Sequence, residues 1–345
     1  MTNHAVRRIA ALAATALATA CLTSGPVNAA DPFYKGKTVT AYVGASPGGA
    51  NDLTIRLVVK HMAEHLDGHP LIVVKNMPGA GSRKLASYMF SVAPKDGSEI
   101  AMVDRNVFTD WLLQKDKTNL VDPRQLTWIG SPVQETLTCV SWHTSAVQGL
   151  DDLKTKPFII GSTGASSGEV LAANELNAYI GAKVKTITGY PGGSEMNLAM
   201  QRGEADGRCG LGWGAIKASY SNWLNSGEMK ILIQLSLEGH PELKDVPVLG
   251  QLAEDQSAKQ ALVLLLADQK VGRPIVAPTG ISNVRRDELS KGLDDTLRDS
   301  AFLAEAQAQK YDIRPISGAE ITKLLASLFA LPPEVVERAQ QVANY

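Results

Sequence analysis

The chain has 345 residues, a length that favours two lobes over one small domain. Its 34 basic and 35 acidic residues give a formal net charge of −1, which excludes the strong positive field of a nucleic-acid or anionic-membrane binder. Because 44% of the residues are hydrophobic and no tract is of low complexity, the chain can form a real core.

The first 29 residues have the pattern of a secretory signal peptide. Arg7 and Arg8 precede an apolar, alanine-rich run, and small residues at 27 and 29 favour cleavage after Ala29. We therefore expect an exported mature protein. Lipoprotein processing at Cys21 is the alternative, but the expected Leu three positions upstream is missing. No later stretch reaches the ~18 apolar residues that a membrane-spanning helix needs.

Short β-rich runs then alternate with helical runs. We expect strands at 38–43, 71–74 and 99–103, with helices at 50–66 and up to about residue 91 between them. This βαβαβ order predicts a parallel sheet with helices on both faces. Ligands bind beyond the carboxyl ends of the strands in such sheets, so the glycine loops at 47–49 and 76–82 fall on the functional edge.

The second half repeats this chemistry. Strands are expected at 126–133 and 137–142, leading away from the first lobe, and the alternation restarts with a strand–turn–helix unit at 158–176. A strand at 184–187, a turn at 191–193 and a helix at 194–200 follow. We expect a strand at 230–237 that returns to the first lobe, a helix at 251–266, and a strand and turn at 273–282. Three amphipathic helices, broken at Pro315 and at Pro332-Pro333, complete the chain.

Glycine turns at Pro47, Gly164 and Gly192 each join a strand to a helix. Helix N-termini present unpaired N–H groups and the positive end of the helix dipole. If the turns face one another across two lobes, the sequence predicts an anionic ligand, most simply a carboxylate, held by backbone N–H groups and hydroxyls.

At these residues the chain resembles the periplasmic receptors of tripartite tricarboxylate transporters, the Bug-type receptors. The matching segments are SPGGAND, NMPGAG, APKDG, IGSTGASSG, TGYPGGSEMNLAMQRGEADGRCG and APTGIS, in order over essentially the whole mature chain. The resemblance implies an α/β, two-lobed periplasmic-binding-protein (Venus-flytrap) fold, each lobe a mainly parallel sheet flanked by helices. We expect lobe 1 to comprise residues 30–133 and 240–345, and lobe 2 to comprise residues 134–239.

The resemblance also implies a receptor that captures a small organic carboxylate between its lobes and docks on a membrane permease. We expect a monomer without a cofactor; a ligand sensor for a membrane kinase is an alternative. The residues expected to contact or shape the ligand are Ser46, Pro47, Gly48, Gly49, Asn51, Asp52, Arg105, Ser162, Thr163, Ala165, Ser166, Ser167, Tyr190, Gly192, Gly193 and Asp206.

Some residues depart from the family pattern, and these departures affect which ligand is expected to bind. Arg105 stands where the family has small polar residues, and it either holds a second carboxylate in the cleft or points into solvent. Tyr190 and Asp206 are expected to tune selectivity. Asp52 is expected to order its turn, because it would repel an anion, although it could meet an amine or hydroxyl of the ligand.

Other readings of the sequence are weaker. The segment GASSG matches a nucleophile elbow, so an exported serine hydrolase using Ser166 is an alternative; only His240 lies downstream as a base, with Asp206 as acid by order alone. His61, His65 and His69 recur at helical spacing but are expected on a solvated helix end rather than at a metal. Cys139 and Cys209 form either a disulfide or two buried thiols.

Overall fold

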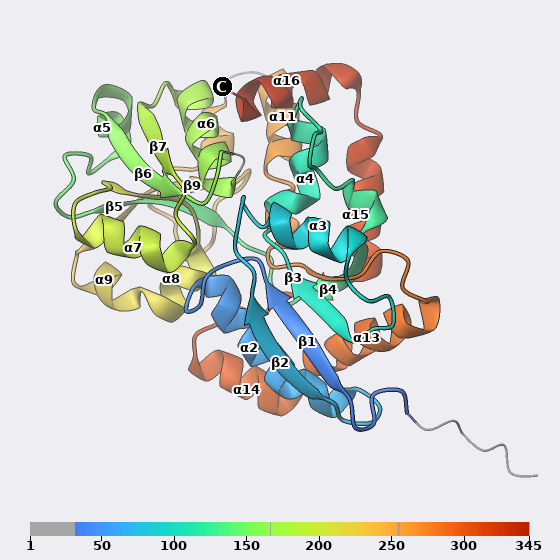
Figure 1. The fold of residues 1–345 in the computed structure, drawn as a ribbon. Coiled ribbons are helices and arrows are strands. Elements are labelled where there is room, and N and C mark those ends of the chain that lie inside the picture. Colours follow the sequence, from blue (N-terminus) through green and yellow to red (C-terminus); the bar gives the residue numbers. More distant parts are fainter. Residues whose placement is uncertain (1–31, 166, 254–255, 345) are drawn as a thin grey trace, which may run out of the picture. The chain divides into compact units, whose positions relative to one another are not determined.

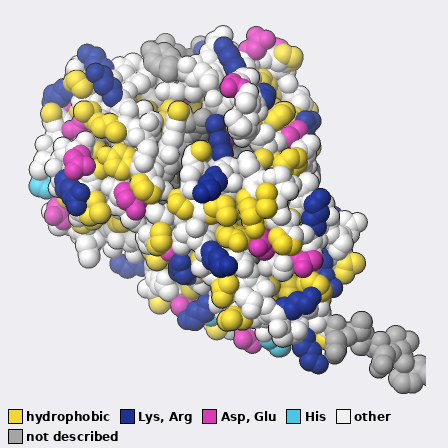
Figure 2. Space-filling model, in the orientation of Figure 1, with side chains coloured by type: hydrophobic (Ala, Val, Ile, Leu, Met, Phe, Trp, Pro, Cys, Tyr) yellow, Lys and Arg dark blue, Asp and Glu magenta, His cyan; other side chains and the backbone are white. Residues whose placement is uncertain are grey.

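A computed structural model describes residues 32–165, 167–253 and 256–344. The predicted signal peptide, its cleavage site, Cys21 and Ser166 lie outside the described residues. Within the described part of the chain, no helix is both long and apolar enough to cross a membrane. Acidic and basic side chains are interspersed over the face seen in Figure 2, in keeping with the near-zero net charge.

The first lobe is built on a sheet with the strand order β11-β4-β10-β3-β1-β2 (Figure 1). Its central strand β1 pairs in parallel with β2 and β3, and α2 and α3 make the two connections. This is the predicted βαβαβ unit. The strands are β1 (Thr38–Val43), β2 (Leu71–Asn76), β3 (Glu99–Met102), β4 (Thr127–Ser131), β10 (Ile275–Ala277) and β11 (Ile316–Ser317).

The second lobe is built on a sheet with the order β7-β6-β8-β5-β9. Strand β6 pairs in parallel with β7 and β8, whereas β5 runs antiparallel to β8 and β9. These strands are β5 (Leu137–Trp142), β6 (Phe158–Ser162), β7 (Val184–Thr188), β8 (Gly207–Gly212) and β9 (Met229–Leu235).

The predicted two-lobed α/β fold is confirmed, but both sheets are mixed rather than mainly parallel. In the first sheet β10 runs antiparallel to β3 and β4, and β11 runs antiparallel to β4. The antiparallel pairs involve strands next to the segments that pass between the lobes, where a right-handed βαβ crossover is not required. Strand β9 was predicted to return to the first lobe; it is instead the edge of the second sheet, paired with β5 along its length.

The helices follow the predicted alternation, with some additions that the pattern did not indicate, such as α4 directly after Arg105. Their bounds are α2 (Ala50–Met62), α3 (Arg83–Ser91), α4 (Asn106–Leu113), α5 (Leu150–Thr155), α6 (Gly168–Ile180), α7 (Gly193–Gln201), α8 (Trp213–Ser219), α9 (Ser221–Asn225), α10 (Leu249–Leu252), α11 (Gln256–Leu265), α12 (Asp268–Val271), α13 (Asn283–Thr296), α14 (Ser300–Ala308), α15 (Gly318–Phe329) and α16 (Pro333–Ala343), with short 3-10 helices at η1 (Ala63–His65) and η2 (Pro123–Gln125).

The C-terminal region contains α13 to α16, one helix more than expected. The extra break is at Asp299, whose side chain accepts a hydrogen bond from the backbone N–H of Phe302 and caps α14. Helix α16, which belongs to the expected lobe 1 by sequence, also packs on the second lobe. In α16, Gln340 donates to the Leu112 carbonyl of α4, while Asn174 of α6 donates to the carbonyl of Ala343. Helix α16 therefore bridges one helix from each lobe.

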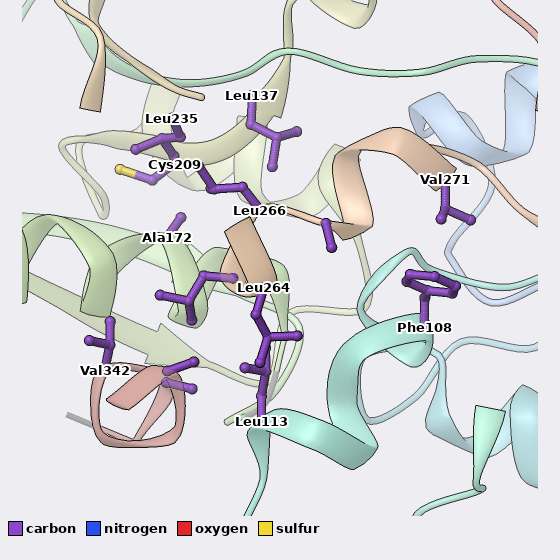
Figure 3. Close-up of a cluster of buried hydrophobic side chains, with 14 of the residues drawn as sticks. Phe108, Leu113, Leu137, Ala172, Cys209, Leu235, Leu264, Leu266, Val271 and Val342 are labelled. Carbon is purple, nitrogen blue, oxygen red and sulfur yellow. The ribbon is translucent and has the colours of Figure 1, made fainter. Parts of the chain in front are cut away.

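The main hydrophobic core runs between the lobes beside these bridging helices (Figure 3). It joins Phe108 and Leu113 of α4 to Leu137 and Leu235 of the second sheet, with Leu264 of α11 between them. Burial of such side chains is the main favourable term in folding, so the lobes are held together along this side.

Cys139 of β5 and Cys209 of β8 form a disulfide between adjacent strands, and both are fully buried. Of the two alternatives left open by the sequence, the structure has the bridge. It closes a sequence separation of 70 residues inside the second lobe.

Candidate functional site

A cavity of about 80 Å³ lies where turns of the first lobe meet turns of the second. The first lobe contributes residues that follow β1, β2 and β3, and the second contributes residues that follow β6 and belong to α7 and β8. The cavity is therefore at the carboxyl ends of parallel strands, the predicted functional edge. Its lining is Gly44, Ala45, Gly49, Ala50, Asn51, Gly81, Ser82, Asp104, Arg105, Glu135, Thr163, Glu169, Gly192, Gly193, Met196, Arg208, Gly210, Leu211, Gly212, Ala215 and Arg273.

Helix N-termini from both lobes reach this cavity. Gly49 precedes α2, Gly192 precedes α7, and Glu169 belongs to the first turn of α6; all three residues line the cavity. The first N–H groups of a helix have no partner within the helix. Their convergence creates a region that favours negative charge.

Asp52 holds the first turn in place. Its carboxylate accepts hydrogen bonds from the Gly48 N–H at 2.9 Å, from the Arg56 guanidinium and from the Asn76 amide. Burial opposes ionisation of Asp52, but these hydrogen bonds outweigh it and lower the pKa of the carboxyl. Gly48 has a φ of +78°, a backbone conformation that glycine adopts readily. Asp52 therefore stabilises the turn, and its carboxylate oxygens are already hydrogen-bonded within the protein.

The same turn contacts the second lobe directly. Ser46 Oγ donates to Glu195 Oε2 at 2.8 Å, and Ser194 Oγ donates to the Pro47 carbonyl at 3.3 Å. A Cβ atom on Gly192 would lie 2.2 Å from Ser46 Oγ, so only glycine fits there without displacing the serine. These contacts bring the N-termini of α2 and α7 together at the cavity.

Arg105 lines the cavity but is already paired. Its guanidinium lies 3.2 Å from Asp268 and 3.6 Å from Glu135, and its Nη2 donates to the Gly210 carbonyl at 2.9 Å. Burial opposes the charged form, but the surrounding carboxylates raise the pKa of Arg105 further. Arg273 in turn lies 2.6 Å from the other oxygen of Glu135. Arg105 therefore ties its own lobe to β8 and to the connecting segments.

Arg208 is a cavity arginine with an unused donor and, unlike Arg105, no carboxylate partner among the described residues. Its side chain is buried, with 6% of the residue exposed. Nη1 donates to Asn197 Oδ1 at 2.7 Å, but among the described residues Nε has no hydrogen-bond acceptor and no carboxylate oxygen lies within 4.0 Å of the guanidinium. A buried guanidinium without a counter-ion is costly, so this group is suited to receive an anion.

Ser82 adds a second unused donor to the cavity lining. It is 1% exposed, and its Oγ has no hydrogen-bond partner among the described residues. Its φ of +69° turns the chain directly before α3. A hydroxyl in this position can donate to a ligand oxygen.

Acidic side chains form another part of the cavity wall. Asp104 and Glu169 line the cavity together with Glu135. Burial raises the pKa of Asp104, and the nearby charge of Glu169 adds to this effect, while Arg105 opposes it. Burial likewise raises the pKa of Asp268, to about 6, and raises that of Glu175 well above its ordinary value.

The structure places the predicted ligand-binding residues in three groups. Those that line the cavity are Gly49, Asn51, Arg105, Thr163, Gly192 and Gly193. Those that lie outside its lining are Ser46, Pro47, Gly48, Asp52, Ser162, Ala165, Ser167, Tyr190 and Asp206. Ser166 is outside the described residues.

Tyr190 and Asp206 have structural positions instead. Asp206 Oδ2 accepts a hydrogen bond from the Ile159 N–H at 2.8 Å, at the opposite end of β6 from Thr163. The ring of Tyr190 covers Gly161 of β6, where a Cβ atom would lie 3.0 Å from the ring. Neither side chain is therefore aimed at the cavity.

Several cavity residues were not identified from the sequence. They are Ser82, Asp104, Glu135, Glu169, Arg208 and Arg273. Asp104 directly precedes Arg105, and Glu169 directly follows the segment IGSTGASSG. Both are therefore next to residues that the sequence predicted at the site. Glu135 and Arg273 are on the segments between the lobes, and only the three-dimensional structure brings them to the cavity.

The structure does not assemble the residues of the alternative readings. Asp206 is bonded to backbone, and His240 Nδ1 accepts from the Glu242 N–H at 3.2 Å, so these residues do not form the acid–histidine pair of a hydrolase. His61 lies 2.8 Å from Glu305, and His65 lies 3.6 Å from Asp299. Within the described ranges, no group of three or more His, Cys, Asp or Glu side chains could hold a metal ion.

The fold is shared with solved periplasmic binding proteins. The protein BugD aligns with a TM-score of 0.70 at 20% identity, over 90% of this chain and 98% of BugD. MatC from Rhodopseudomonas palustris, solved with bound malate, aligns at 0.68 and 18% identity, over 89% and 99%. Another R. palustris protein, solved with adipate, aligns at 0.69 and 16% identity, over 89% and 97%.

No protein-family model and no curated protein sequence matches the chain. The structural comparisons therefore establish the fold, the two-lobed periplasmic-binding-protein architecture. They agree with the Bug-type resemblance found in the sequence.

Proposed function

We propose that this protein is a periplasmic solute-binding receptor of the tripartite tricarboxylate transporter type, which captures a small organic carboxylate between its lobes. The observation that carries the proposal is the buried Arg208, whose Nε is unused, at a cavity where the N-termini of α2 and α7 converge. Solved proteins of the same fold hold malate and adipate, which supports a carboxylate.

In this proposal the anion is held by groups from both lobes. Arg208 and the first N–H groups of α7 belong to the second lobe, while Ser82 and the N-terminus of α2 belong to the first. A ligand that contacts both sides is bound fully only when the lobes meet, so it shifts the population toward the closed arrangement. Glu135 and Arg273 line the cavity and lie on the segments between the lobes. We expect the ion pair between them to respond to that movement.

Delivery to a membrane permease, export by residues 1–29, and a monomeric state belong to the same proposal. So do the lobe boundaries near residues 133/134 and 239/240, which adjoin the segments that carry Glu135 and α10. A receptor whose closed form differs from its open form offers a permease a surface that reports occupancy.

The test is binding of carboxylates to the purified protein, measured by isothermal titration calorimetry, with each acid compared with its neutral amide. An Arg208→Met variant should lose binding at least about tenfold, because a charge-assisted contact is removed. Arg208→Lys keeps the charge without the planar fork and should fall between the two. The matched control is Arg202→Met, an exposed arginine at the end of α7. Binding of acid and amide with equal affinity would contradict the proposal.

A further inference from the structure

The charges around the cavity are not those of a site for an anion alone. The carboxylates of Asp104, Glu135, Glu169 and Asp268 all act on Arg105. Arg105 is paired with Asp268 and Glu135, and Arg273 is paired with Glu135. Around Arg105, four carboxylates are therefore accompanied by two guanidinium groups.

The two carboxylates left over are those that line the cavity beside Arg105. Among the described residues, neither Asp104 nor Glu169 has a Lys or Arg nitrogen within 4.0 Å. Glu169 Oε2 is buried and has no hydrogen-bond partner there. An acid in the first turn of α6 is favoured by the helix dipole, but this accounts for its position and not for the unbonded oxygen.

The same cavity is also lined by the buried Arg208, whose Nε lacks an acceptor among the described residues. A cavity with an unused guanidinium donor on Arg208 and an unbonded carboxylate oxygen on Glu169, which lines it together with Asp104, is complementary to a ligand that carries both charges. The lining also includes the apolar side chains of Met196, Leu211 and Ala215, which suit a short carbon skeleton.

We propose that the ligand is a small amino acid or similar zwitterion, with its carboxylate at Arg208 and Ser82 and its protonated amine between Asp104 and Glu169. This inference rests on the proposed carboxylate receptor and names its substrate class. An ammonium group has three N–H donors and no acceptor, so it can bond both acids at once. A simple dicarboxylate would instead place a second negative charge against Asp104 and Glu169, which is unfavourable.

The experiment compares acids that share a carbon skeleton and differ in the amine. Calorimetric titrations would use aspartate and succinate, alanine and propionate, and 4-aminobutyrate and butyrate, with malate and lactate as hydroxyl analogues. We expect at least one amino acid to bind at least about tenfold more tightly than its partner without the amine, because a buried charge-assisted hydrogen bond is then satisfied.

The variant is Glu169→Gln, which keeps the shape and removes the charge. It should weaken binding of the amino acid at least about tenfold and should not weaken binding of the partner acid, because a negative charge that repels that acid is removed. Asp104→Asn should act in the same direction. The control is Glu204→Gln, an exposed acid of the same lobe, and melting curves establish that each variant is folded.

The outcomes separate the two proposals. Equal or tighter binding of the acids without an amine, or of the hydroxy acids, together with no effect of Glu169→Gln, would overturn the zwitterion and leave the carboxylate receptor in place. Absence of binding by both series would overturn both proposals. Selective loss of the amino acid in Glu169→Gln, with Arg208→Met losing both members of a pair, would support both.

Discussion

Ser46 Oγ donates a hydrogen bond to Glu195 Oε2 at 2.8 Å, and this contact joins the turn before α2 to the first turn of α7. Both turns also supply residues to the cavity lining, Gly49 from one and Gly193 from the other. The contact between the lobes and the site for the ligand are therefore parts of one arrangement, and a change in one should be measurable in the other.

Ser46→Ala should weaken ligand binding. The substitution removes the donor to Glu195 and leaves a partly buried carboxylate without that bond, a loss of roughly 1–3 kcal/mol for a charge-assisted hydrogen bond and so about fivefold or more in affinity. Calorimetry would measure it. Ser91→Ala, an exposed serine of α3, is the control. Unchanged affinity in Ser46→Ala would show that this contact makes no difference to closure.

Gly192→Ala should hinder closure more strongly than Ser46→Ala does. The new methyl group would lie 2.2 Å from Ser46 Oγ and 3.1 Å from its backbone nitrogen, so the two turns must move apart. We expect weaker binding with little change in melting temperature, because the strain is relieved by opening. Small-angle scattering with and without ligand would follow the opening. Gly214→Ala is matched to it, since a Cβ atom there has no neighbour within 4 Å.

Removal of the disulfide should destabilise the second lobe. In the chain-entropy model, a bridge across 70 residues stabilises the folded state by about 4 kcal/mol. Urea unfolding of the Cys139→Ala/Cys209→Ala double variant should show a lower midpoint, and dithiothreitol should lower the midpoint of the parent protein but not of the variant. A midpoint that is the same in all four conditions would contradict the prediction.

The contribution of Asp110 and Asp268 to stability should fall as the pH rises from about 4 to 6. Burial raises the pKa of Asp110 and of Asp268 from 3.8 to about 6 in the folded state, so in this window the folded state binds more protons than the unfolded state. Each group contributes on the order of 2 kcal/mol that is present at low pH and lost as the pH passes through the folded pKa. The measurement is the free energy of unfolding in urea across this range.

Asp110→Asn and Asp268→Asn should each make the slope of stability against pH more positive than in the parent protein over this range, whatever their effect on absolute stability. Asp116→Asn is the control, because hydrogen bonds with Thr118 lower the pKa of this exposed carboxyl and its titration lies below the window. A slope that is equal in all variants would show that neither buried acid titrates there.

Local pattern was sufficient to predict much of the fold. Strand β1 and strand β5 have the bounds expected from β-branched and aromatic runs. The glycine turns predicted at 47–49 and 191–193 lie between strand and helix, although α7 begins one residue earlier than expected, at Gly193. These features depend on neighbours in sequence, such as Asp52 bonding the Gly48 N–H four residues away.

Features that depend on distant residues could not be predicted in this way. The edge position of β9 follows from its pairing with β5, and the bridging position of α16 follows from contacts with α4 and α6. The charged lining of the cavity has the same origin. Asp206 was predicted at the site, and Arg208, two residues later, was not. The structure has Arg208 in the cavity lining, whereas the Asp206 carboxylate accepts a hydrogen bond from the Ile159 N–H near the start of β6.

The central claim is that an anion binds at Arg208, and calorimetry with one pair of proteins tests it most directly. The parent protein and Arg208→Met would be titrated with the tightest-binding acid of the series and with its amide. We predict that the parent binds the acid and not the amide, and that Arg208→Met loses the acid by at least about tenfold. Equal binding of the acid by both proteins would contradict the claim.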